Sequence, residues 1–343
     1  MSFRICCRLS RPAYTKQTMA KRIAIVERNK CNPLGCGDYL CIRVCPVNKM
    51  GKECIVKADY KKAKIVDELC TGCGICPKKC PYGAISIINL PEKLTDNPIH
   101  RYGPNMFELF NLPIVKPNTV VGIIGRNGIG KSTALAILSG MVTPNLGNYK
   151  NPPSTKEIHN KYSTSILGDY FKKLFSSNLK VSYKPQRVEL LAISYKGHNV
   201  SELLKKIDER GVSEKLMKEL DMENLSDRTV EQLSGGELQR LAIIAACSKK
   251  ADVFYFDEPT SFCDITHRIK VAKIIRELAV VGSVIVVEHD LATLDYISDE
   301  IQIIYGEPSC YGIISQSKSV RRGVNEYLDG YLPDDNMRFR QYS

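Results

Sequence analysis

Three uninterrupted apolar runs organise the larger part of this chain. Residues 120–124 (VVGII), 253–256 (VFYF) and 284–287 (VIVV) have the length and composition of buried strands. The first run leads through a glycine-rich turn into an apolar helix at residues 132–138, and residues 241–249 form another apolar helix. Buried strands that alternate with helices predict an α/β fold for this region.

Two more polar stretches are also predicted to be helical. Residues 155–180 contain the amphipathic piece DYFKKLF at 169–175, and residues 201–224 are charged throughout. The mixture of aromatic residues and lysines at 169–175 suits contact with RNA, although a solvated helix with one packed face has the same pattern.

The first part of the chain carries an internal repeat between residues 22 and 90. Each half pairs a short strand with a cysteine run that closes in Cys-Pro. The runs are Cys31, Cys36, Cys41, Cys45 and then Cys70, Cys73, Cys76, Cys80. The second run has the spacing that bacterial ferredoxins use to bind iron–sulfur clusters. Zinc sites use paired cysteines some distance apart, so zinc is the less favoured alternative.

The two runs are predicted to share their ligands. In two-cluster ferredoxins the cysteine before proline ligates the neighbouring cluster. This borrowed assignment gives two 4Fe–4S sites: Cys45, Cys70, Cys73 and Cys76 in one, and Cys31, Cys36, Cys41 and Cys80 in the other. Cys54 belongs to neither run and is interpreted as a small buried hydrophobe.

Charge and cysteine are both concentrated at the N-terminal end. Residues 1–99 hold 18 Lys and Arg against 8 Asp and Glu, whereas the rest holds 31 against 29, and the whole chain carries +12. The basic end suggests a polyanionic partner such as nucleic acid, or it offsets the negative charge of bound clusters. Eleven of the 14 cysteines precede residue 81, and with 343 residues they indicate metal ligation in a reducing compartment rather than a disulfide scaffold.

Residues 1–18 have no acidic residue and four Arg or Lys, and we expect a disordered leader there. A mitochondrial presequence is the less favoured alternative, and Met19 is a second plausible start. No apolar run approaches the ~20 residues that span a bilayer.

The turn after the first apolar run is the phosphate-binding motif GRNGIGKS, residues 125–132. Its glycines let backbone N–H groups surround phosphate oxygens at the start of the next helix. Lys131 is expected to reach the β- and γ-phosphates, and Ser132 to join the Mg²⁺ shell. The candidate phosphate-binding residues are Gly125, Asn127, Gly128, Gly130, Lys131, Ser132 and Thr133.

Further candidates lie at the ends of other elements. Asp257, which ends a buried strand, is placed to support Mg²⁺, and Glu258 to polarise the attacking water. His289 follows the strand at 284–287 and is a candidate γ-phosphate sensor. Tyr102 and Phe107 are candidates to stack on adenine, with ordinary packing equally plausible.

These motifs stand in the order GRNGIGKS, Gln186, LSGGELQR (233–240), FYFDEP and VEHD, and resemble an ATP-binding-cassette (ABC) ATPase domain. With the two Cys-Pro runs, HRYGPNMFELFNLP and the terminal VNEYLDGYLPDDNMRFR, residues 22 to about 340 resemble the ribosome-recycling ATPases of ABC subfamily E, the RNase L inhibitor family. The expected fold is an α/β ABC-type P-loop ATPase domain preceded by a ferredoxin-like α+β two-cluster domain. The expected division is a leader (1–18), the ferredoxin-like domain (19–96), the ABC domain (97–316) with its helical insertion near 155–180, and a hinge segment (317–343).

The resemblance implies that the chain splits ribosomes into subunits in an ATP-dependent cycle linked to initiation. It implies ATP, Mg²⁺ and two 4Fe–4S clusters as cofactors, with Ser132, Gln186 and Asp257 around Mg²⁺, Glu258 as catalytic base and His289 as switch. Ser234, Gly235 and Gly236 would contact ATP bound on an opposite cassette. The implied partners are the small ribosomal subunit and its RNA, termination and initiation factors, and a second ABC domain, in the cytoplasm and without a membrane.

Several positions depart from the family pattern. Arg322 stands where the family usually has Glu, and YSTSI at 162–166 lacks a basic residue of the insertion. The 343 residues contain no second cassette, so we expect ATP binding with poor hydrolysis unless a second ABC domain acts in trans. The alternative is a hydrolysis-deficient, half-length module that binds a ribosome or an initiation factor.

Overall fold

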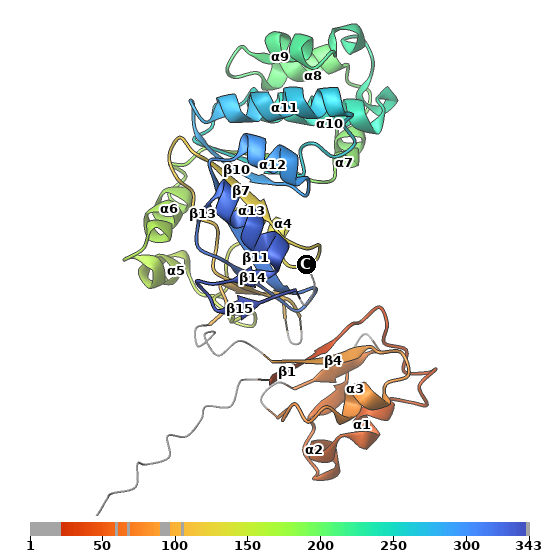
Figure 1. Ribbon diagram of the computed structural model, residues 1–343. Helices are drawn as coiled ribbons and strands as arrows, with labels where there is room; N and C mark the ends of the chain where they lie inside the picture. Colours follow the sequence, from red (N-terminus) through yellow and green to blue (C-terminus); the bar gives the residue numbers. More distant parts are fainter. Residues whose placement is uncertain (1–21, 59–60, 67–68, 90–96, 104–105, 341–343) are drawn as a thin grey trace, which may run out of the picture. The chain divides into compact units, whose positions relative to one another are not determined.

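The computed structural model of the chain describes residues 22–58, 61–66, 69–89, 97–103 and 106–340, so the predicted leader lies outside the described residues. The chain divides into two compact units, residues 1–96 and 97–343, which are considered separately (Figure 1). Among the described residues, no helix has both the length and the apolar character needed to cross a membrane.

The first unit is built from very short elements around its cysteines. Strand β1 (Arg22–Val26) pairs antiparallel with β4 (Ile85–Asn89), and β2 (Ile55–Lys57) pairs antiparallel with β3 (Ala63–Ile65). Its helices are α1 (Leu40–Val44), α2 (Pro46–Lys49) and α3 (Ile75–Lys79). Both cysteine runs therefore reach a short helix: α1 and α2 meet at Cys45, and α3 ends before Cys80.

A nine-stranded sheet forms the centre of the second unit, in the order β5-β6-β12-β11-β7-β10-β9-β8, with β13 beside β11. The strands β11, β7, β10, β9 and β8 run parallel, and β5, β12 and β13 add antiparallel pairs. Their bounds are β5 (His100–Arg101), β6 (Glu108–Phe110), β7 (Val120–Ile124), β8 (Val181–Lys184), β9 (Val253–Asp257), β10 (Ser283–Val287), β11 (Glu300–Glu307), β12 (Tyr311–Ile314) and β13 (Lys318–Ser319).

The central strands are buried on both faces, as their apolar runs predict. Along β9, Phe254 and Phe256 face one core, and Val253 and Tyr255 face the other. The first core is completed by α8 (Val200–Ile207), α9 (Ser213–Glu219), α10 (Gly235–Cys247), α11 (Ile265–Leu278) and α12 (Leu291–Ile297). The second is completed by α4 (Lys131–Leu138), α5 (Thr155–Tyr162) and α6 (Ile166–Phe175).

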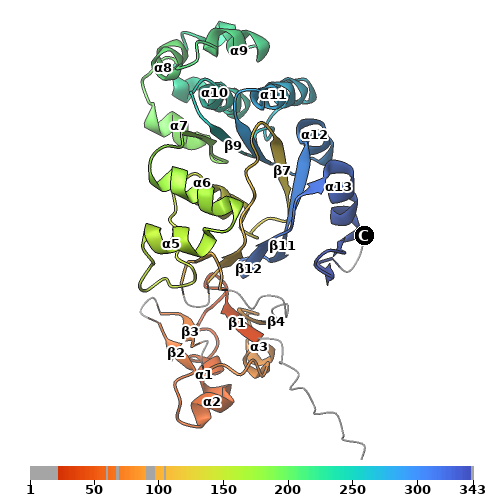
Figure 2. The same cartoon turned by 90° about the vertical axis from the view of Figure 1, so that its left-hand side faces the viewer.

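The predicted helical stretches are present, with different ends. The charged stretch at 201–224 is two helices, α8 and α9, and the helix expected from residue 241 begins at Gly235 because Ser234 caps it. The insertion forms α5 and α6, which lie together on the other side of the sheet from α12 and α13 (Figure 2).

The segment predicted as a hinge belongs to the second compact unit over its described residues, 317–340. It contains β13, α13 (Val320–Asp329), β14 (Tyr331–Leu332) and β15 (Met337–Arg338). The buried ammonium of Lys318 pairs with the carboxylates of Glu326 and Asp334, and Arg322 pairs with the same two at 2.6 and 2.7 Å. Arg322, which departs from the family pattern, therefore has local partners of opposite charge.

Candidate ATP and cluster sites

The loop from Gly125 to Gly130 joins β7 to α4, as the phosphate-binding motif requires. At Gly125 any Cβ would lie 2.4 Å from the carbonyl oxygen of Ile304, so only glycine fits beside β11. Gly130 has a φ of 96° and packs against the ring of Phe107, 2.4 Å from where a Cβ would stand. The sequence therefore folds the loop tightly onto the sheet.

Lys131 lies inside this loop. Its Nζ donates to the carbonyl oxygens of Gly125 and Arg126, both at 2.9 Å, and to Asn127 Oδ1 at 3.3 Å. Burial lowers the pKa of Lys131 to about 8, against the opposing charges of Glu258 and Asp257. The ammonium is thus a desolvated donor at the position where a phosphate would be bound.

Asp257 brings the end of β9 to the same edge of the sheet. Its carboxyl group is buried, and it interacts with the hydroxyls of Ser132 and Tyr183. Burial raises the pKa of Asp257, and its Oδ2 atom has no hydrogen-bond partner among the described residues. A buried carboxylate oxygen without a partner, beside a serine hydroxyl, has the oxygen chemistry that Mg²⁺ prefers.

Glu258 and His289 come together at this edge. His289 Nε2 lies 3.1 Å from Glu258 Oε1, and the Ser261 hydroxyl donates to Glu258 Oε2 at 3.3 Å. The backbone of Glu258 is left-handed, with a φ of 48°, a conformation that is costly for a residue with a side chain. Contacts with neighbouring residues must therefore stabilise this backbone conformation of Glu258.

Two residues that the sequence interpretation missed supply those contacts. Buried Lys184 donates from Nζ to the carbonyl oxygens of Asp257 and Glu258, at 2.9 and 3.2 Å. Gln239 of α10, also buried, donates from Nε2 to the carbonyl oxygens of Glu258 and Pro259, at 2.7 and 2.8 Å. We call Lys184 and Gln239 the carbonyl clamp. The sequence feature that could have indicated Lys184 is its position at the end of a strand, directly before Pro185.

Glu288 is a third missed residue. Its Oε1 accepts from the backbone N–H and the hydroxyl of Thr260, at 2.8 and 2.7 Å, and its Oε2 accepts from the N–H of His289 at 3.1 Å. Glu288 therefore joins the loop after Glu258 to the residue that contacts Glu258.

The remaining candidates lie at different places around the loop. Gln186 is exposed two residues after β8, which pairs with β9 and ends at the same edge as Asp257. The Tyr102 hydroxyl lies 3.2 Å from that of Thr133, and its ring is partly exposed. Phe107 packs under Gly130, so Tyr102 is the more exposed of the two aromatic candidates.

The signature residues present an exposed surface. Ser234 and Gly235 are exposed at the start of α10, and Ser234 and Glu237 form a reciprocal capping box. Gly236 approaches the carbonyl oxygen of Phe262, 3.0 Å from where a Cβ would stand. An exposed helix start of this kind suits a bound phosphate.

In the first unit, the eight predicted cysteine ligands line two cavities. Cys31, Cys36, Cys41 and Cys80 line the first, and Cys45, Cys70, Cys73 and Cys76 line the second. These are the two sets that the crossed assignment predicts. Burial, together with the charge of neighbouring cysteines, raises the pKa of Cys41 to about 11 and that of Cys76 to about 12. Several thiolates close together need a compensating cation, and cluster iron supplies one.

Family models match both units. The model described as "ABC transporter" matches residues 113–261, "Possible Fer4-like domain in RNase L inhibitor, RLI" matches residues 22–53, and "4Fe-4S binding domain" matches residues 63–86. These matches confirm the predicted class, an α/β ABC-type ATPase domain preceded by an iron–sulfur domain.

Individual relatives match almost the whole chain. It is 50% identical to Protein Pixie of Drosophila melanogaster over 330 residues, 96% of this chain and 53% of that protein. It is 48% identical to translation initiation factor RLI1 of Saccharomyces cerevisiae over 325 residues, 93% of this chain and 53% of that protein. It superposes with a TM-score of 0.88 and 52% identity on a chain in a model of ribosome-bound archaeal Pelota and ABCE1, covering 94% of this chain and 54% of that one. The chain therefore spans about half the length of the relatives it matches.

Proposed function

We infer that this chain, which belongs to the RNase L inhibitor family of ABC proteins, binds and hydrolyses ATP to act on ribosomes in recycling and initiation. One observation carries the proposal. At a single edge of the sheet, the described residues bring together the desolvated Lys131, the Ser132–Asp257 pair and the Glu258–His289 pair. The two cysteine cavities precede this edge in the same chain.

Each of these residues has a task in hydrolysis. Lys131 and the backbone N–H groups of the loop bind the β- and γ-phosphates. Glu258 accepts a proton from, or orients, the attacking water, and His289 holds the Glu258 carboxylate in place from 3.1 Å. Ser132, Asp257 and Gln186 would hold Mg²⁺, whose charge offsets that of the phosphates.

We propose that a second ABC domain completes the site. Ser234 and Gly235 are exposed at a helix start, which suits a phosphate bound on a facing cassette. In the same way, the signature segment of the facing cassette would lie over Lys131. It would stabilise the charge that develops on the transferred phosphate. The chain by itself then binds ATP and hydrolyses it poorly.

We propose two 4Fe–4S clusters, one in each cysteine cavity. Cys31, Cys36, Cys41 and Cys80 would hold the first, and Cys45, Cys70, Cys73 and Cys76 the second. Chemical analysis of the purified chain is expected to give about eight iron and about eight sulfide per chain. Stoichiometric zinc with little iron would refute this cofactor.

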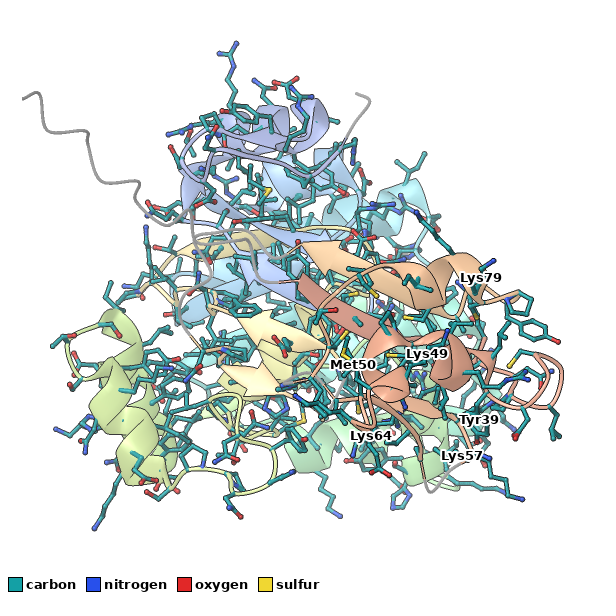
Figure 3. The ribbon with its side chains drawn as sticks, turned by 90° about the horizontal axis from the view of Figure 1, so that it is seen from below. Tyr39, Lys49, Met50, Lys57, Lys64 and Lys79 are labelled. Atoms are coloured by element: carbon teal, nitrogen blue, oxygen red, sulfur yellow. The ribbon has the colours of Figure 1, made fainter. Side chains whose placement is uncertain are left out.

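The proposed macromolecular partner is the small ribosomal subunit and its RNA, together with termination and initiation factors, in the cytoplasm. Lys49, Lys57 and Lys79 are exposed on the first unit and come from α2, β2 and α3 (Figure 3). Exposed lysines that come from several elements suit a phosphate backbone better than a single small anion. In the second unit, α5 and α6 supply further lysines.

The experiment is sedimentation of ribosomes with the full chain, with ADP or with a non-hydrolysable ATP analogue. We expect binding that requires the ATP analogue and weakens with salt. Glu258→Gln should keep ATP binding and lower any ATPase rate by about 10²–10⁴-fold. Binding that is the same with every nucleotide would replace this proposal with the hydrolysis-deficient binding module.

A further inference from the structure

A ninth cysteine lies at the wall of the second cluster cavity. Cys54 is 1% exposed and lines this cavity with Cys45, Cys70, Cys73 and Cys76. The thiols of Cys45 and Cys70, which line the same cavity, are the titratable groups that act on the Cys54 thiol. Cys54 is therefore part of the apolar core of this unit and at the same time part of the wall that the four predicted ligands form.

The backbone holds Cys54 in this position. The Val66 N–H donates to the carbonyl oxygen of Cys54 at 2.7 Å. The side chain of Asn48, three residues after Cys45, bonds both the N–H and the carbonyl oxygen of Ile55, each at 2.8 Å. Asn48 therefore fixes the chain next to Cys54 against the turn that carries Cys45.

The first cavity differs in this respect. The described residues that line it include four cysteines, Cys31, Cys36, Cys41 and Cys80, and each belongs to the predicted ligand set. The second cavity thus has five thiols at a site that takes four, and the first has four. This difference provides an internal control for the function of the fifth thiol.

We propose that Cys54 is a reserve ligand of the second 4Fe–4S cluster, which takes the place of Cys45 or Cys70 when either is lost. The inference rests on the proposed cluster cofactor. In the exchange the departing thiolate releases iron and takes up a proton, and Cys54 loses its proton and bonds the same iron. One Fe–S bond breaks, one forms, and no electron is transferred.

The test measures iron and sulfide in the full chain after single and double substitutions. Wild type, Cys70→Ala and Cys45→Ala are each expected to hold about eight iron, because Cys54 replaces the missing thiol. Cys70→Ala/Cys54→Ala and Cys45→Ala/Cys54→Ala are expected to hold about four. Low-temperature EPR of the reduced proteins should give the same result as a halved spin count in the double variants only.

Cys36→Ala is the matched control in the first cavity. It should fall to about four iron, whether or not Cys54→Ala is added. A cluster lost from both Cys70→Ala and Cys45→Ala while Cys54 is present, whether or not the variants fold, would overturn the proposal. Retention of about eight iron by either double variant would also overturn it. Wild type that contains zinc instead of iron is a separate outcome, which refutes the cofactor itself.

Discussion

The two units of this chain differ in the interactions that stabilise their folds. The second has a nine-stranded sheet with an apolar core on each face, and its strands β7, β9 and β10 are buried at every position. The first has strands and helices of three to five residues, and cysteines are part of its core. Elements this short bury little apolar surface, so we expect the first unit to need bound metal for stability and the second not to need it.

Removal of iron is the strongest test of that difference. We expect a chelator under oxidising conditions to abolish amide-exchange protection in the described residues of the first unit, because the two cavities collapse. Protection in β7, β9 and β10 should be unchanged. Hydrogen exchange with mass spectrometry measures both units in one sample. Equal loss of protection in both units would contradict the comparison.

Within the second unit, the carbonyl clamp should affect catalysis without affecting ATP affinity. Lys184→Met removes two hydrogen bonds from a charged donor, each about 1.5–3 kcal/mol, that hold the backbone of Glu258. We expect kcat to fall by about 10–100-fold while KM for ATP stays constant. The ATPase rate is measured with the chain together with a second ABC domain that restores turnover. Exposed Lys180→Met is the matched control, and an equal effect of both substitutions would exclude the clamp.

Asn48→Ala should weaken the first unit alone. It leaves the N–H and carbonyl of Ile55 without their side-chain partner, at a cost of about 1–3 kcal/mol. We expect faster amide exchange in β2 and β3, and no change in the sheet of the second unit. Lys52→Ala, at an exposed neighbouring position, should leave both units unchanged.

Lys184 should also make the stability of the second unit depend on pH. Burial lowers the pKa of Lys184 from 10.5 to about 8. Between these values the unfolded chain binds the proton and the folded chain does not, so the free energy of unfolding rises with pH. Relative to Lys184→Met, wild type should gain at most about 1.4 kcal/mol per pH unit from about pH 8 to 10. Urea unfolding followed by circular dichroism measures this difference, and a gain that falls with pH would contradict the assignment.

Local patterns predicted much of the fold and the shape of the site. The run VVGII, the loop GRNGIGKS and the strand before Asp257 each depend on neighbours in sequence, and the structure has the predicted strands and helix there. The crossed cysteine sets came from the pattern of two-cluster ferredoxins, and the same two sets line the two cavities.

The remaining features depend on residues that are distant in sequence. Lys184 contacts the carbonyls of Asp257 and Glu258 from a strand more than 70 residues earlier. Gln239 reaches Glu258 from the helix that carries the signature. Phe107 was a candidate for adenine, but its ring lies under Gly130, because that glycine leaves space for it. The spacing of apolar residues along the sequence does not indicate such long-range contacts.

The crossing of the cysteine sets has a consequence for how the first unit folds. Each cavity takes thiols from both runs, so a cluster in either one ties residues near 31–45 to residues near 70–80. A bound cluster then acts as a cross-link that closes a long loop, and loop closure removes conformational entropy from the unfolded chain. The first cluster to be inserted would bring together the thiols of the second cavity. Assembly of the two clusters is therefore expected to be cooperative, and folding of this unit to be limited by the delivery of iron and sulfide.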